Sequence, residues 1–483
     1  MTRATLLLTL ASCAAVPSGP AGERTEEPER LSPPVEGVRY RVRVDEALRR
    51  MGIRVCFDGR PPEVLVPMSS SAARVLVGAQ GDRGQPLRHE PTGRIELGRL
   101  GRGACVRYEV DLARAGGRQA VRRGSDLLVT QALFLWRPPR WAPSVRIAIE
   151  IEGPPGVHVS SAWPRPTGSQ GRVLFRPDRS VWKAPGNVVF IHAPPLHVEV
   201  GSTQLEIAIL EGELAVARAD VERWLTGALR AASAMDGRFH RPQVHVAVVP
   251  VGPGSRPVAF GLVRRGGGPS VMLLVHENAG AEALAADWTA VHELSHLALP
   301  RMHREDRWIA EGFATYYQEV LRARAGLITP QEAWASLAAG FERGRFRGRR
   351  PTLWRDAERM ADVGRIYWAG AAFVLDADVR FRQRGSSLDR WIGRFRPSWQ
   401  GSTDAWRGLE VLGRIDRLFG QPLARPLAIR YGRMRTYPDT DTLLRRLGVR
   451  SLGDRRVQFD DEAPLAAVRR AITAPRDAVV NAE

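Results

Sequence analysis

Lysine is almost absent from this chain: Lys183 is its one lysine, although lysine and arginine together number 71 of 483 residues. The formal net charge is +19, and nearly all of the positive charge is arginine scattered along the sequence. A clustered basic surface would indicate nucleic acid or an anionic membrane as a partner. Because no run of basic and aromatic residues resembles a nucleic-acid motif, we expect a solvated basic surface and no nucleic-acid partner.

Long apolar runs are also lacking. Beyond the amino terminus no stretch approaches 18 uninterrupted apolar residues, so we expect no membrane-spanning helix there. Residues 1–13, MTRATLLLTLASC, combine one basic residue, a short apolar run and small residues, which predicts a lipoprotein-type signal peptide. Its end, Leu10-Ala11-Ser12-Cys13, resembles the bacterial lipobox. We therefore expect an exported, periplasm-facing lipoprotein of the bacterial cell envelope, held at the membrane through a lipidated Cys13; a plain signal peptide and a misplaced start codon are the alternatives.

Cysteine is scarce, with three in the chain, and only Cys56 and Cys105 follow the signal. Each lies in a run that predicts a strand, IRVCFDG and ACVRYEVDL. In an oxidising compartment a disulfide between them would close a loop of about 50 residues and stabilise the fold by roughly 3–4 kcal/mol. We favour this pairing over two buried free thiols.

Composition and periodicity divide the rest of the chain. Residues 14–36 are rich in proline, glycine and charge, which predicts a flexible tether. Short alternating runs between glycine and proline turns, the last at 197–201, predict an all-β sandwich-like domain over 37–202. Residues 203–400 predict a mainly helical domain with a small β-sheet, and 401–483 a short helical region. The fold class is thus α+β and multidomain. The expected helices lie near 281–299, 306–325, 330–343, 364–384 and 387–395.

One motif carries the chemistry: His292-Glu293-Leu294-Ser295-His296. On a helix, His292 and His296 lie on one face, so both imidazoles can bind one cation. Glu293 can reach water beside the metal without being a ligand itself, as in the H-E-x-x-H metalloproteases. Two ordinary helical histidines are the alternative that the rest of the sequence must decide against.

A third ligand follows at the expected distance. Trp308, Glu311, Gly312 and Tyr316 occupy the positions of W-x-x-E-G-x-x-x-Y, and Glu311 lies 15 residues after His296. With the HExxH motif, this resembles the gluzincin zinc metallopeptidases. The resemblance implies a thermolysin-like catalytic domain in which His292, His296 and Glu311 bind one Zn²⁺ per chain.

A later segment extends the resemblance to the glycyl aminopeptidase and aminopeptidase N group. Tyr367-Trp368-Ala369-Gly370, Leu375-Asp376 and Ser387-Leu388-Asp389 are similar to the Y-x-K-G, LD and SLD segments of that group. The resemblance implies that Tyr367 donates a hydrogen bond to the oxyanion of the reaction; a tyrosine that only packs in a helix bundle is the alternative. These relatives often have a glutamate seven residues after the third ligand, where this chain has Gln318 followed by Glu319.

The implied activity is zinc-dependent hydrolysis of peptide bonds in a peptide or protein, by metal-activated water with Glu293 as general base. Two alternatives stay open: a catalytically inactive zinc-containing protein of envelope binding or assembly, and a hydrolase of non-peptide amides or esters.

Two features depart from the resemblance. The hairpin predicted around Phe260-Gly261-Leu262-Val263-Arg264-Arg265 holds no acidic residue to bind a substrate's free amine, so aminopeptidase and endopeptidase activity both remain open. Arg264 and Arg265 would there favour acidic substrates. Residues 401–483 also lack the texture of the carboxy-terminal PDZ domain that glycyl aminopeptidases commonly carry.

Overall fold

The computed structural model describes residues 34–475 apart from 99, 166–172, 346, 347, 349, 401 and 403. The predicted signal peptide and most of the predicted tether lie outside these residues. Within the described part, no helix combines the length and apolar character needed to span a bilayer.

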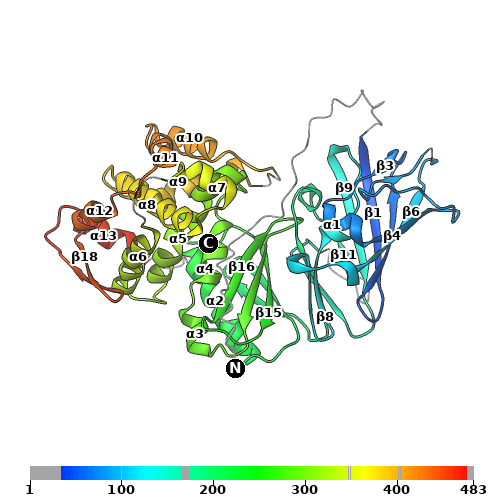
Figure 1. Cartoon of the computed structure of the whole chain (residues 1–483), viewed down its shortest axis with the longest axis horizontal. Helices are drawn as coiled ribbons and strands as arrows, with labels where there is room; N and C mark the ends of the chain where they lie inside the picture. The colour runs from blue at the N-terminus through cyan, green and yellow to red at the C-terminus, as the bar shows by residue number, and fades with distance from the viewer. Residues whose placement is uncertain are drawn as a thin grey trace.

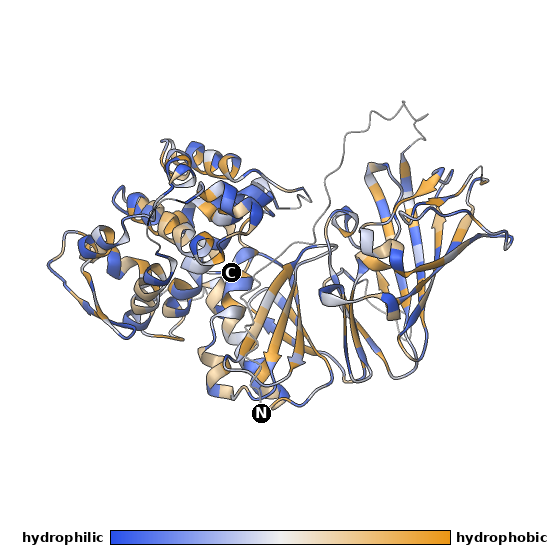
Figure 2. Ribbon diagram, in the orientation of Figure 1, coloured by the Kyte–Doolittle hydropathy of each residue, from blue (hydrophilic) through white to orange (hydrophobic). Residues whose placement is uncertain are grey.

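The amino-terminal part is a β-sandwich of two sheets, as the alternating runs predicted (Figure 1). The six-stranded sheet has the order β11-β9-β1-β2-β6-β4: Val173–Phe175, Trp141–Glu152, Val35–Val44, Arg50–Phe57, Cys105–Asp111 and Leu76–Gly81. The four-stranded sheet has the order β10-β12-β8-β7: His158–Ser161, Asn187–Ile191, Asp126–Thr130 and Ala120–Arg123. Buried residues such as Val38, Tyr40 and Val42 alternate with exposed ones along β1, the pattern of a sheet with one face in the core. Hydrophilic and hydrophobic segments accordingly alternate along strands of the sandwich (Figure 2).

A disulfide joins the neighbouring strands β2 and β6. Cys56 and Cys105 are directly opposite in this antiparallel ladder, and their Cα atoms are 4.1 Å apart. The predicted pairing is therefore confirmed. Because the cysteines are 49 positions apart in the sequence, the restriction of the unfolded chain stabilises the sandwich by about 4 kcal/mol.

A separate sheet of five strands begins the part that follows the sandwich, in the order β13-β14-β15-β17-β16: Leu196–Val200, Thr203–Ile209, Gln243–Val251, Ser270–His276 and Val258–Arg264. The expected hairpin is thus β16–β17, with β16 at the edge. The run at 197–201, assigned from sequence to the sandwich, pairs instead with β14 of this sheet. Alternation of side chains marks a strand but does not say which sheet it joins.

Helices from between β14 and β15 and from beyond β17 share one apolar core with this sheet. They are α2 Arg218–Ser233, α3 Ala281–Ala286, α4 Thr289–His296, α5 Arg307–Arg324, α6 Pro330–Gly344, α7 Leu353–Arg359, α8 Val363–Arg382 and α9 Leu388–Phe395. The expected helices from 306 onward correspond to α5, α6, α8 and α9. The helical carboxy-terminal region is also present: α10 Gly408–Phe419, α11 Ala424–Arg433, α12 Thr440–Arg446 and α13 Ala466–Thr473, with a small hairpin of β18 Val449–Gly453 and β19 Arg456–Phe459.

The four-stranded sheet of the sandwich packs against the five-stranded sheet (Figure 1). An apolar layer fills this junction: Leu128, Val189 and Ile191 from the sandwich, and Ala208, Leu210, Ala247, Val249 and Met272 from the five-stranded sheet and the residue after β14. A buried polar cluster adjoins it, where Ser160 Oγ donates to Glu206 Oε1 at 2.5 Å and lies 2.9 Å from His245 Nε2. The sandwich is therefore docked through a packed interface.

Candidate zinc site

The helix that carries the HExxH motif is shorter than the sequence predicted. The expected helix over 281–299 is two helices, α3 and α4, because the chain is extended at Asp287. The Asp287 carboxylate accepts a hydrogen bond of 2.7 Å from the N–H of Thr289, the first residue of α4. A carboxylate at this place satisfies one of the free N–H groups of the new helix and favours a fresh start. His292, Glu293 and His296 therefore lie on a helix of eight residues.

The three predicted ligands come together at one point. Nε2 of His292 and Nε2 of His296 each lie 3.4 Å from Oε2 of Glu311, and the ligand atoms of all three are within 4.8 Å of one another. Donor atoms bound to zinc at about 2.0–2.1 Å in a tetrahedral site lie roughly 3.3–3.4 Å apart. The observed separations match that arrangement.

Two of the three ligand atoms have no hydrogen-bond partner. His296 Nε2 and Glu311 Oε2 are buried and accept no hydrogen bond, and the side chains of His292 and Glu311 are only 2% and 6% exposed. Burial alone would raise the pKa of the Glu311 carboxyl, but the two histidines beside it hold that pKa well below its usual range. Leaving an ionised carboxylate and an imidazole buried without partners is costly. A divalent cation between them removes this cost, so the residues fit a zinc ion.

Glu293 lies beside this cluster and is not one of its three members. Glu293 is 3% exposed, and its Oε2 has no hydrogen-bond partner. Space for the carboxylate depends on Gly261 of β16, where a Cβ would lie 2.6 Å from Cγ of Glu293. Burial raises the pKa of Glu293, which suits a group that must take up a proton near neutral pH.

A chain of polar contacts orients His292 from behind. Gln318 Oε1 lies 2.8 Å from Nδ1 of His292, and the Gln318 amide donates to Glu319 at 2.9 Å. Arg322 in turn donates to Glu319 at 3.1 Å. Since an amide oxygen can only accept, the proton of His292 is on Nδ1 and its Nε2 lone pair faces the metal position. Gln318 thus contacts the ligand, and Glu319 accepts a hydrogen bond from Gln318. The sequence alone did not show which of these two residues would contact the histidine.

Two glycines bring Tyr367 to the site. A Cβ on Gly312 of α5 would lie 2.2 Å from the carbonyl carbon of Gly370, and a Cβ on Gly370 of α8 would lie 2.2 Å from the carbonyl oxygen of Trp308. The two helices therefore touch backbone to backbone at this point. One turn before Gly370, the ring of Tyr367 stacks on that of His292, with centroids 5.7 Å apart and planes 3° from parallel.

Other residues of the signature have structural contacts. Tyr316 is fully buried and donates to Asp378 at 2.9 Å. Asp389 of the SLD segment accepts from Tyr317 and pairs with Arg324 at 3.1 Å. These buried hydrogen bonds and this ion pair join α5, α8 and α9, so this part of the motif holds the helices that carry Glu311 and Tyr367.

The two arginines of the hairpin do not have the role that the sequence suggested. Arg264 is buried and donates to the carbonyl oxygen of Arg118 in the sandwich. Arg265 donates to the main-chain carbonyls of His296, the last residue of the zinc motif, and of Leu299. Both guanidinium groups are therefore engaged within the protein, and the expectation that they favour acidic substrates is wrong.

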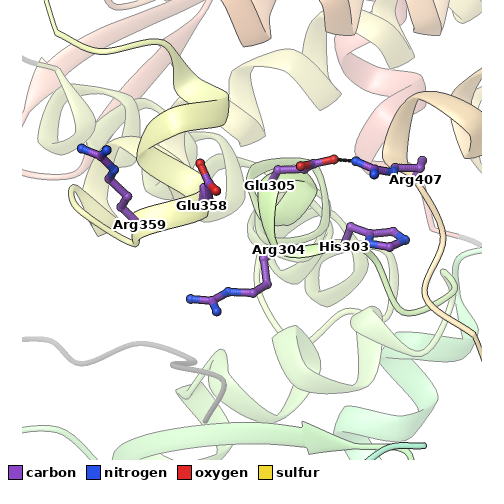
Figure 3. A pocket seen from close by; sticks show the side chains of 6 residues that line it. All are labelled: His303, Arg304, Glu305, Glu358, Arg359 and Arg407. Carbon is purple, nitrogen blue, oxygen red and sulfur yellow. Dashed lines mark ion pairs between the residues drawn. The ribbon is translucent and has the colours of Figure 1, made fainter. Parts of the chain in front are cut away.

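A separate pocket of about 530 Å³ lies where the chain enters α5 (Figure 3). His303 lines it, and Glu305 and Arg407 pair across it. None of the three ligands borders this pocket. His303 is half-buried here and does not belong to the His-His-Glu cluster.

Comparison with known proteins agrees with this geometry. Residues 292–365 match the family model of the M61 glycyl aminopeptidases, while no curated protein matches the chain. The site is that of a zinc metallopeptidase. The fold resembles an aminopeptidase N family protein from Idiomarina loihiensis, with TM-score 0.67 and 14% identity over 88% of this chain and 82% of that one. It also resembles the M1 zinc metallopeptidase from Deinococcus radiodurans, with TM-score 0.51 and 18% identity over 84% and 94% of the two chains. For yeast LTA4 hydrolase the TM-score is 0.51 and the identity 11%, over 86% and 70%.

These likenesses confirm the gluzincin resemblance, by sequence over the zinc motifs and by fold over most of the chain. The expected fold class, a β-rich amino-terminal part followed by a helical catalytic part, is confirmed as well.

Proposed function

We propose that this protein is a zinc-dependent peptidase, with residues 196–400 as its catalytic domain and Glu293 as its general base. One observation carries the proposal: a buried carboxylate with an unpartnered oxygen lies directly beside a His-His-Glu cluster of metal-binding geometry. A metal site that served stability alone would not need Glu293, since that residue is not among the ligands. Its placement therefore favours catalysis over the inactive alternative.

His292, His296 and Glu311 would hold the zinc ion, which when bound makes water more acidic and polarises a carbonyl group. Glu293 accepts a proton at its free Oε2 while the water oxygen adds to the carbonyl carbon of the scissile bond. Glu293 then returns that proton to the leaving nitrogen, and the C–N bond breaks. Tyr367, stacked on His292, donates its phenolic proton to the developing oxyanion, a hydrogen bond that strengthens in the transition state.

We infer that a free substrate amine is not required. The hairpin from 258 to 276, whose edge strand β16 runs past Glu293, contains no acidic residue that could bind an ammonium group. An edge strand can instead take up an extended peptide by main-chain hydrogen bonds, which do not depend on a chain end. The favoured substrates are therefore peptides cleaved at internal bonds.

A peptide library with free and with acetylated amino termini tests this. We expect both forms to be cleaved at internal bonds. Release of single amino-terminal residues from the free form alone would show an aminopeptidase. Cleavage of esters but not of peptides would favour a hydrolase of non-peptide amides or esters.

We also propose that the protein is exported and tethered by lipid on Cys13. The disulfide between Cys56 and Cys105 supports an oxidising compartment, because such bonds are rare where thiols are kept reduced. Replacing Cys13 with alanine should move the protein from the membrane fraction to the soluble fraction; an unchanged distribution would argue against the lipid anchor.

A further inference from the structure

The turn that joins β16 to β17 is buried against the β-sandwich. It consists largely of three consecutive glycines, 266–268. A Cβ on Gly266 would lie 2.1 Å from the carbonyl oxygen of Ala184, and a Cβ on Gly268 would lie 2.1 Å from that of Ala162. Since these neighbours are backbone atoms of the sandwich, only glycine allows the turn to approach so closely.

Hydrogen bonds fix the same turn. The N–H groups of Arg265 and Gly266 both donate to the carbonyl oxygen of Pro185, at 3.1 and 2.9 Å. Trp163, fully buried in the sandwich, donates from Nε1 to the carbonyl oxygen of Gly266 at 2.8 Å. The sandwich therefore determines where the turn lies.

The side chain of Arg265 extends from this turn to the end of the zinc-motif helix. Its guanidinium donates to the carbonyl oxygen of His296 at 2.6 Å and to that of Leu299 at 2.9 Å. The carbonyl of His296 lies in the last turn of α4, where a cation interacts favourably with the helix dipole. Two bonds from one planar group fix the direction of this segment as well as its position.

The helix held in this way is short. α4 spans eight residues and ends at His296, so a displacement of its end moves a metal ligand directly. One turn earlier, Glu293 packs against Gly261 of the same hairpin. The hairpin thus contacts this helix at two places: Gly261 packs against Glu293, the proposed general base, and Arg265 binds the main chain of the ligand His296.

We propose that Arg265 is a positioning residue of the metal site, which transmits the docking of the β-sandwich to the main chain of His296. The inference rests on the zinc site proposed above. It gives the sandwich a part in metal binding, although the sandwich supplies no ligand.

Arg265→Met tests this, with Arg264→Met as the matched control. Arg264 is the adjacent residue and is buried, but its side chain donates to the sandwich, at the carbonyl oxygen of Arg118. Loss of a group that orients a ligand weakens metal binding by about tenfold to a hundredfold, so we expect the zinc dissociation constant of Arg265→Met to rise at least about tenfold. The control should stay within about twofold of the wild type.

Two further measurements separate positioning from stability. The visible absorption spectrum of the cobalt-substituted protein reports ligand geometry, and it should change in Arg265→Met but not in the control. Arg265→Lys keeps the charge but not the planar pair of donors, so its zinc affinity should lie between those of Arg265→Met and the wild type. It also replaces the methionine variant if that variant does not fold.

The inference would be overturned if Arg265→Met bound zinc as tightly as the wild type. It would also be overturned if Arg265→Met and Arg264→Met lost zinc affinity equally and in proportion to a fall in their melting temperatures. Zinc binding is measured without substrate, so the outcomes are distinguishable. A protein that binds zinc in an Arg265-dependent way but cleaves no peptide would overturn the proposed activity and support this inference, whereas a wild type without zinc affinity would overturn both.

Discussion

Gln318 accepts a hydrogen bond from His292: its amide oxygen lies 2.8 Å from Nδ1 of the imidazole. A carboxylate at this place would add negative charge behind the ligand, whereas the amide only fixes the tautomer and the ring plane. The charge lies one residue further along, on Glu319, which accepts from the Gln318 amide and from Arg322. This chain of hydrogen bonds from Arg322 through Glu319 therefore reaches His292 through the neutral amide of Gln318.

Gln318→Ala should lower zinc affinity by about tenfold, because the ring of His292 loses its only oriented acceptor in this chain of hydrogen bonds. Gln318→Glu is the matched control: it keeps the shape and adds charge, so its zinc affinity should equal or exceed that of the wild type. Competition with a chromophoric chelator measures both. Wild-type affinity in the alanine variant would remove Gln318 from the site.

Tyr367→Phe should reduce kcat by about a hundredfold with little change in KM, because loss of an oxyanion donor acts on the transition state. The phenylalanine ring can still stack on His292, so the melting temperature should be preserved. Tyr316→Phe is the contrasting variant. It removes a buried hydrogen bond to Asp378 and should cost about 1–3 kcal/mol of stability with kcat maintained. A Tyr367→Phe enzyme with full kcat and a lowered melting temperature would show a packing role.

Acid should weaken the junction between the sandwich and the five-stranded sheet through His245. Burial lowers the pKa of His245 from 6.5 to about 4, although Glu206 raises it and Arg165 lowers it further. Because Ser160 donates its hydroxyl proton to Glu206, its oxygen accepts from Nε2–H of a neutral His245. The folded state thus favours the uncharged ring. The contribution of His245 to the free energy of unfolding is therefore fully present above pH 6.5. It is lost as the pH drops from 6.5 to about 4, and the loss is about 3 kcal/mol.

Urea unfolding at pH 7 and pH 4.5 measures this loss, and His245→Gln is the control. The exposed His197 also faces Glu206, at 3.8 Å, and remains in the variant. We expect the glutamine variant to lose much less stability between these pH values than the wild type. An equal loss in both proteins would assign the pH dependence to other groups.

Much of the site followed from the sequence because its residues are local in the chain. The spacing of His292 and His296 places both on one helical face, and Glu311 follows on the next long helix. Alternating runs likewise predicted strands such as β1 and β9, although the alternation at 197–201 did not reveal that β13 joins the five-stranded sheet.

What the sequence could not supply are contacts between distant segments. Arg265 was assigned to substrate because nothing in the hairpin indicates that its turn is buried in the sandwich. The break at Asp287 was missed because the apolar spacing continues across it while one carboxylate decides the start of α4. Gln318 and Glu319 could be told apart only by which of them reaches His292 across 26 residues.

The zinc content and peptide turnover of Glu293→Gln test the central claim most directly. Glutamine has the shape of glutamate but cannot take up the proton. Since Glu293 is not a ligand, we expect about one zinc per chain, as in the wild type. Turnover should fall by about a hundredfold to ten-thousandfold, the contribution of a general base. A variant that keeps its zinc and cleaves peptides at the wild-type rate would contradict the account.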